Sequence, residues 1–160
     1  MWLLIYMTNE FQTELNNVAK RCTALRTLMT ARSVSRLYDH AMKPLGLTGT
    51  QFTLLVSISS QQFKSISELG EALNIEKSTL SRNLRPLLTA NLIERDKNST
   101  GRAISHVLTR RGELTLEKAY PVWKSVQDTL EAEIGEEELG RGYAFLKNLR
   151  KASKTAVSED

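Results

Sequence analysis

The sequence contains a single cysteine, Cys22, and only two histidines, His40 and His106. One thiol excludes an intramolecular disulfide and a metal site built from several cysteines. The histidines stand far apart and have no pattern of acidic ligands beside them, so we expect neither a metal ion nor a cofactor. The sequence also lacks a glycine-rich phosphate loop and a nucleophile flanked by paired carboxylates, and this argues against an enzyme.

Long apolar runs are absent as well. No segment approaches the roughly 18 consecutive apolar residues of a membrane span. The opening stretch, Met1–Met7, is apolar, but it has neither the basic start nor the small-residue cleavage site of a signal peptide. Either translation begins at Met7, or the stretch is an apolar strand held within a dimer. We therefore expect a cytoplasmic protein that makes no membrane contact.

Proline and glycine are scarce, with three and eight residues in 160, and neither occurs before Pro44. Between about Asn9 and Lys43, apolar residues recur with the period of a helix. These positions are Leu15, Val18, Ala19, Cys22, Leu25, Leu28, Met29, Val34, Leu37, Tyr38, Ala41 and Met42. A helix of about 35 residues would be on the order of 50 Å long. It cannot bury its apolar stripe within one small domain, so we expect a partner chain.

The middle of the chain has the pattern of a helix-turn-helix. Capping boxes at Thr48–Gln51 and Ser65–Glu68 each predict the start of a helix. In the helix after Ser65 we expect Ile66, Leu69, Ala72 and Leu73 to face inward. Gly70 would permit close helix packing, and Asn74 would adopt the left-handed conformation of a tight turn. The next helix should run from about Lys77 to Ala90, with a bend at Pro86 and an inward face of Leu80, Leu84, Leu87 and Leu88.

Two short strands should follow, at Leu92–Asp96 and Ala103–Leu108, around a basic tip at Lys97–Arg102. Thr109 would cap a helix from about Arg110 to Glu133, kinked at Pro121. A last helix should run from about Glu136 to Ala152, with a frayed tail after Ser153. The predicted fold is therefore mainly α, an α+β winged helix. It divides into an N-terminal helix (1–47), a winged helix-turn-helix (48–111) with a two-stranded wing, and C-terminal helices (112–160).

The positive charge is concentrated in this winged segment. The whole chain carries a formal net charge of +4. Between Glu76 and Arg111, eight basic residues face three acidic ones, a net charge of +5, whereas the preceding and following segments carry +2 and −3. A local positive field suits phosphate binding, while a solvated charged surface without a partner is the alternative.

Five segments together resemble the MarR family of winged-helix transcription factors, named for multiple antibiotic resistance regulators. They are Leu45–Phe52, Ile66–Leu73, Ser78–Leu87, Leu92–Arg95 and Val107–Gly112. The resemblance covers nearly the whole chain. It implies a cytoplasmic homodimer that binds a pseudo-palindromic operator in double-stranded DNA. The N-terminal dimerisation helix (1–47) and the C-terminal dimerisation helices (112–160) would then be intertwined as one domain. Family members are mostly repressors released by small aromatic ligands or by cysteine oxidation, so we expect a role in stress response.

The resemblance also implies roles for particular residues. Arg82 and Arg85 are the best candidates for contact with base edges or phosphates, although an exposed helical arginine often only aids solubility. The other predicted DNA-binding residues are Lys77, Ser78, Thr79, Ser81, Lys97 and Arg102. Arg102 would lie in the minor groove or on phosphate. The wing differs from the family pattern because no aspartate directly precedes this arginine.

Two further sites have simpler alternatives. Cys22 could be a redox sensor among nearby basic residues, or simply a small apolar core group. Arg26, Met29, Phe52 and Trp123 could line a ligand pocket, although such residues more often belong to a core. Three functions therefore compete: a ligand- or redox-responsive regulator, a DNA-binding protein without an effector, and a protein-binding helical module or enzyme. Salt-sensitive binding to duplex DNA would exclude the third.

Overall fold

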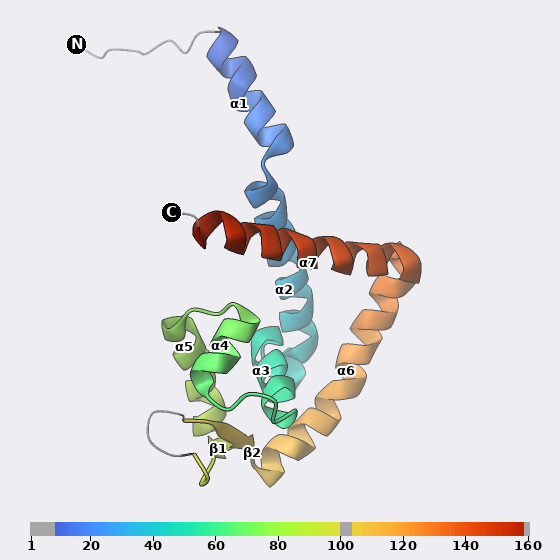
Figure 1. The fold of residues 1–160 in the computed structure, drawn as a ribbon. Coiled ribbons are helices and arrows are strands. Elements are labelled where there is room, and N and C mark those ends of the chain that lie inside the picture. The colour runs from blue at the N-terminus through green and yellow to red at the C-terminus, as the bar shows by residue number, and fades with distance from the viewer. Residues whose placement is uncertain (1–8, 100–103, 159–160) are drawn as a thin grey trace, which may run out of the picture. The chain divides into compact units, whose positions relative to one another are not determined.

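The computed structural model describes residues 9–99 and 104–158, and these residues form two compact units divided between Leu37 and Tyr38. Helices dominate both units, and a two-stranded antiparallel sheet lies in the second (Figure 1). The predicted mainly α winged-helix class is confirmed.

The first unit corrects one prediction. In place of one continuous helix, α1 (Asn9–Arg21) ends before Cys22 and α2 (Thr23–Met42) begins after it. The Arg26 guanidinium donates two hydrogen bonds, of 3.2 and 2.7 Å, to the Lys20 carbonyl oxygen. The Leu25 N–H donates to Cys22 Sγ at 3.4 Å. Side chains thus take up backbone groups that a regular helix pairs with one another, and this favours a break.

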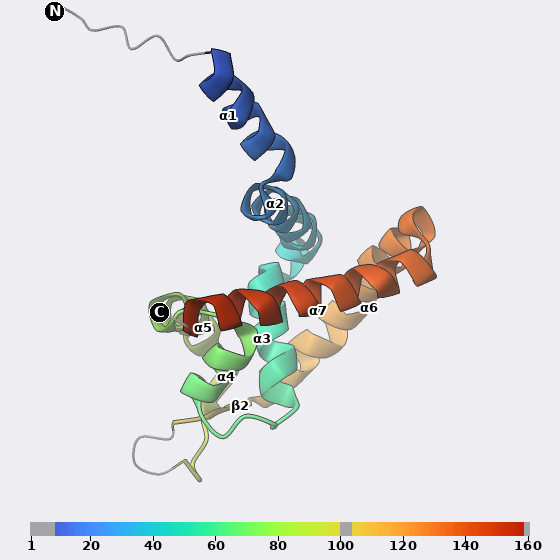
Figure 2. The same cartoon turned by 45° about the horizontal axis from the view of Figure 1, so that its top comes forward.

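The second unit has its core around α3 (Gly49–Ser59), which follows a 3-10 turn, η1 (Lys43–Leu45). The Thr48–Gln51 capping box is confirmed, with Gln51 N–H donating to Thr48 Oγ1 at 3.1 Å and Thr48 N–H donating to Gln51 Oε1 at 2.9 Å. The core consists of Met42, Leu47, Phe52, Leu54, Leu55, Ile58, Leu69, Leu80, Leu84, Leu87, Leu92, Ile93 and Ala119. Figures 1 and 2 show α3 grouped with α4 (Ile66–Leu73) and α5 (Lys77–Thr89) beside the hairpin of β1 (Ile93–Arg95) and β2 (His106–Leu108).

The helix-turn-helix consists of α4 (Ile66–Leu73) and α5 (Lys77–Thr89). The prediction that Ala72 and Leu88 face inward is wrong, because Ala72 is exposed and Leu88 is 42% exposed. Both lie at the edge of an apolar face, where the packing of neighbouring elements decides burial. The helix α5 continues through Pro86, and Asn91 ends the segment with a φ of 54°.

The strands are shorter than expected. β1 (Ile93–Arg95) pairs with β2 (His106–Leu108), with Ile93 opposite Leu108 and Arg95 opposite His106. The rest of the predicted second strand includes Ala103, which lies outside the described residues.

The C-terminal part contains α6 (Arg110–Ile134) and α7 (Glu136–Ser158). Thr109 caps α6 as predicted, accepting from Gly112 N–H at 3.0 Å. The predicted end of α7 at Ala152 is wrong, because the helix continues to Ser158. Nothing between Ser153 and Ser158 breaks a helix, since this stretch contains neither proline nor glycine.

Candidate nucleic-acid interface

The turn between α4 and α5 sets the position of α5. Asn74 has φ 54° and ψ 44°, the predicted left-handed conformation, and Ile75 N–H donates to the Gly70 carbonyl at 2.8 Å. A Cβ on Gly70 would lie 3.0 Å from Leu80 Cδ2 and 3.2 Å from the Ile75 carbonyl oxygen, so a larger residue would require these neighbours to shift. The close approach predicted for Gly70 is therefore present.

The start of α4 differs in one detail from the predicted capping box. Ser65 Oγ accepts from Glu68 N–H at 3.1 Å, as expected. The Glu68 carboxylate, however, accepts from the N–H of Lys64, at 2.7 Å, and not from that of Ser65. The reciprocal half of the box is therefore displaced by one residue.

The outward face of α5 carries the residues predicted to bind DNA. Leu80, Leu84 and Leu87 are buried on the opposite face. The exposed residues are Lys77, Ser78, Ser81, Arg82 and Arg85, and Thr79 is half-buried. Six of the eight residues predicted to bind DNA therefore lie on α5, and the cationic side chains among them are exposed to solvent.

The two arginines of α5 differ in their surroundings. Arg82 Nη2 donates to Thr79 Oγ1 at 3.0 Å. Within residues 9–99 and 104–158, Arg85 forms neither a hydrogen bond nor an ion pair. Both guanidinium groups are exposed and keep N–H groups available to an acceptor, which a phosphate oxygen or a base edge would provide.

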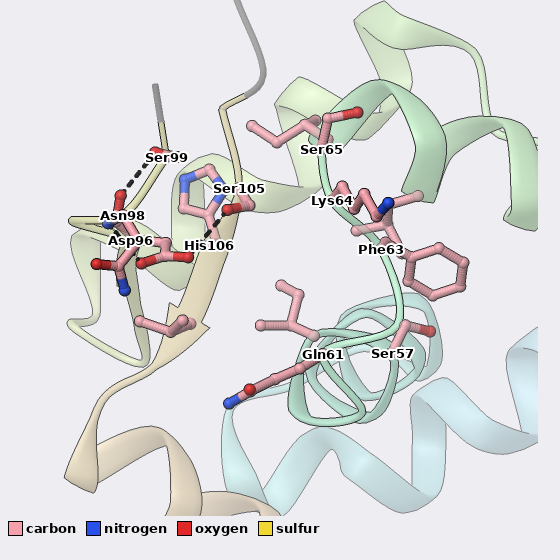
Figure 3. Close-up of a pocket in the computed structure, with 14 residues that line it drawn as sticks. Ser57, Gln61, Phe63, Lys64, Ser65, Asp96, Asn98, Ser99, Ser105 and His106 are labelled. Atoms are coloured by element: carbon pink, nitrogen blue, oxygen red, sulfur yellow. Dashed lines mark hydrogen bonds between the residues drawn. The ribbon is translucent and has the colours of Figure 1, made fainter. Parts of the chain in front are cut away.

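The turn at the base of the wing is organised by Asp96 (Figure 3). Its carboxylate accepts from Asn98 N–H at 2.9 Å and from Ser105 Oγ at 3.3 Å. Its carbonyl oxygen accepts from Ser99 Oγ at 2.6 Å. Lys97 lies exposed in this turn, and the predicted Arg102 lies outside the described residues. Asp96 therefore holds the turn, although no aspartate directly precedes Arg102.

A pocket of about 340 Å³ separates this turn from the segment that leads into α4. Figure 3 shows the Asp96–Ser105 pair on one side of it, and Phe63 and Lys64 on the other. The two sides are joined beyond the pocket by a backbone hydrogen bond of 2.7 Å from Ile66 N–H to the Ile104 carbonyl. The wing is thus tied to the start of α4.

Arg95 is a candidate contact residue that the sequence reasoning passed over. It is exposed at the end of β1, and its Nε donates to Ser99 Oγ at 3.4 Å. The signal in the sequence was a basic residue directly before the polar tip, which was counted only as part of the charge.

His106, opposite Arg95 on β2, has a buried Nδ1 that finds no hydrogen-bond partner among the described residues. Burial lowers the pKa of this imidazole below its ordinary value, and the positive charge of Arg95 lowers it further. The neutral form is therefore favoured in the folded protein.

The residues predicted for a ligand pocket belong to different surroundings. In the first unit, Met29 is 59% exposed and Arg26 bonds to Lys20. In the second, Phe52 is a core residue, and Trp123 packs against the core with its ring 5.8 Å from that of Tyr120. In the described part of the chain, no group of three or more potential metal ligands occurs, and no helix is long and apolar enough to span a membrane.

The fold and the exposed basic helix define a winged helix-turn-helix protein. The model of the MarR family matches residues 47–102. The M. tuberculosis transcriptional regulator MosR, solved in complex with DNA, is 32% identical, with a TM-score of 0.76 over 85% of this chain and 98% of that one. An uncharacterized HTH-type transcriptional regulator of Bacillus cereus is 28% identical over 131 residues, which are 81% of this chain and 88% of the relative. A MarR/EmrR family regulator from Acinetobacter sp. ADP1, 23% identical, shares the fold with a TM-score of 0.75 over 86% and 98% of the two chains.

The chain belongs to the MarR family. It is a DNA-binding transcriptional regulator and not an enzyme, as the sequence predicted.

Proposed function

We propose that this protein is a homodimeric repressor that binds a pseudo-palindromic operator and is released from it by a small aromatic ligand. The observation that carries the proposal is the outward face of α5, with Arg82 and Arg85 exposed above a buried row of leucines. A helix with this arrangement can enter the major groove, while Lys97 and Arg102 of the wing approach the backbone or the minor groove. The MosR complex with DNA supports this docking by likeness.

The homodimer is supported by apolar side chains that the single chain leaves in solvent. In the second unit, Tyr143, Phe145 and Leu146 of α7 are 53%, 63% and 51% exposed. In the first, Val18 and Met29 are each 59% exposed. Clusters of exposed apolar residues usually mark an interaction site. A dimer would hold two copies of α5 about one helical turn of DNA apart, or a multiple of it.

Selection of bound fragments from a random duplex library tests the DNA-binding part of the proposal. The expected result is a pseudo-palindromic site whose affinity falls steeply with salt, because phosphate contacts release counterions. Light scattering in the same buffer should give the mass of a dimer. Absence of salt-sensitive binding, or a selected site without two-fold symmetry, would contradict the proposal.

Release by a ligand is tested by repeating the binding measurement with a panel of small aromatic acids and phenols. One of them should weaken the affinity for the selected site at a concentration that leaves the dimer intact. An affinity that no compound and no oxidant changes would instead identify a DNA-binding protein without an effector.

A redox-sensing repressor that acts through Cys22 is the second candidate. Cys22 lies half-buried at the break between α1 and α2, with its Sγ accepting the Leu25 N–H. Oxidation of this sulfur would remove that bond and alter the break. Peroxide should then abolish operator binding by the wild type but not by Cys22→Ser. Equal behaviour of the two proteins would leave Cys22 as a small packing residue.

A further inference from the structure

Thr79 and Arg82 lie one helical turn apart on α5, and their side chains are joined. Arg82 Nη2 donates to Thr79 Oγ1 at 3.0 Å. Thr79 is half-buried, whereas the arginine is exposed. Arg85, on the same exposed face, has no such partner within residues 9–99 and 104–158. Of the two guanidinium groups on this face of α5, that of Arg82 is therefore held by a side-chain hydrogen bond and that of Arg85 is not, within the described residues.

Thr79 is a rigid partner for this bond. A β-branched side chain has few rotamers in a helix, so the hydroxyl has few positions available. The backbone at Thr79 is also held, because its carbonyl accepts from Asn83 Nδ2 at 2.9 Å and the adjacent Leu80 is 2% exposed in the core. The hydroxyl oxygen is thus fixed relative to the core of the domain.

The hydrogen bond to Thr79 uses one N–H of the Arg82 guanidinium and leaves the others available. A planar guanidinium that is already oriented loses less rotamer freedom when it pairs with a base or a phosphate. Orientation matters most for bidentate pairing with a guanine edge, because both N–H groups must align with O6 and N7. A phosphate contact tolerates a wider range of positions.

We propose that Thr79 is a positioning residue. It orients Arg82 and thereby enables α5 to discriminate between base pairs at the position that Arg82 contacts. Thr79 then acts on sequence recognition through Arg82 and does not itself contact a base. This inference rests on the proposed binding of DNA by α5.

The experiment uses the full-length protein and the operator selected from the random library. Affinities are measured for that operator and for each single base-pair substitution in it. The position at which Arg82→Ala removes discrimination is the Arg82 position, where the wild type should discriminate by about 5- to 150-fold. Thr79→Val, which keeps the branched shape without the acceptor, should lower discrimination there by about 2- to 10-fold. Thr79→Ser keeps the hydroxyl and should retain most of it.

A double-mutant cycle separates positioning from direct contact. In the Arg82→Ala background, Thr79→Val should have no further effect on the affinity for the selected operator. An equal loss of operator affinity in both backgrounds, an even loss over all base-pair positions in the wild-type background, or no loss there would each overturn the proposal. Circular dichroism and thermal melting verify that each variant is folded. If the wild type shows no salt-dependent DNA binding, the proposed function fails as well. If it binds but Arg82→Ala has no position-specific effect, only this inference fails.

Discussion

A Cβ added to Gly112 would lie 1.9 Å from the backbone carbonyl oxygen of Leu92. This carbonyl also accepts the Thr109 N–H at 3.1 Å, and Thr109 Oγ1 donates to the Asn91 carbonyl at 2.6 Å. The first turn of α6 therefore lies directly against Asn91 and Leu92, which connect α5 to β1. Only glycine fits at Gly112, because the opposing atom is backbone and cannot rotate away.

Gly112→Ala should lower the free energy of unfolding by at least about 2 kcal/mol, since overpacking must displace backbone. Alanine is intrinsically the better helix former by about 1 kcal/mol, but the clash outweighs that gain. Urea denaturation measures the change. Gly140→Ala in α7 is the matched control and should be neutral or stabilising, because among the described residues only the helix's own backbone approaches its added Cβ. Equal stability of the Gly112 variant would contradict the packing of α6 against Leu92.

Arg82→Ala should strongly weaken the binding of the selected operator, because a bidentate contact is lost in each of the two half-sites. One such pair contributes about 1–3 kcal/mol of discrimination. The dimer should persist in light scattering. Lys118→Ala, which removes an exposed positive charge from α6, is the control and should bind nearly as the wild type does. An unchanged affinity in the arginine variant would count against this docking of α5.

Phe145→Glu should raise the dissociation constant of the dimer by at least about tenfold, because the side chain is 63% exposed on α7 and a charge would be placed in an apolar interface. Sedimentation at several concentrations gives the constant. Asn148→Glu, an exposed polar position on the same helix, should have little effect. Dimers of equal strength in both variants would place the interface elsewhere.

His106 should make stability depend on pH. Its pKa is lowered in the folded state by burial and by Arg95, so below about pH 6.5 the unfolded chain binds the proton more readily. Stability should therefore be complete above that pH and decline as the pH falls through the lowered folded pKa. Urea denaturation between pH 7.5 and 5 measures this, and His106→Gln should reduce the slope.

The matched control for the pH experiment is His40→Gln, since His40 is exposed in the last turn of α2. This variant should keep the wild-type slope. If the pH dependence of stability survives in His106→Gln but disappears in His40→Gln, it arises from His40 and the prediction for His106 is contradicted.

Much of the winged helix-turn-helix region could be predicted, because the sequence signals for its caps and turns are local. The Thr48 capping box, the left-handed Asn74 and the start of α6 after Thr109 each depend on a few neighbouring residues. The basic face of α5 followed from helical periodicity alone. The Arg82–Thr79 bond was missed because spacing places two side chains on one face without choosing their rotamers.

What the sequence by itself determined was the order of elements, the caps and turns, and the family to which the chain belongs. These depend on backbone preferences and on the period of the apolar residues. Tertiary structure decided which leucines at the edge of α5 are buried, with Leu87 at 1% and Leu88 at 42% exposure. It also decided that Gly112 must be a glycine, because Leu92 lies against it. Both outcomes depend on atoms distant in the sequence, whose positions no local pattern contains.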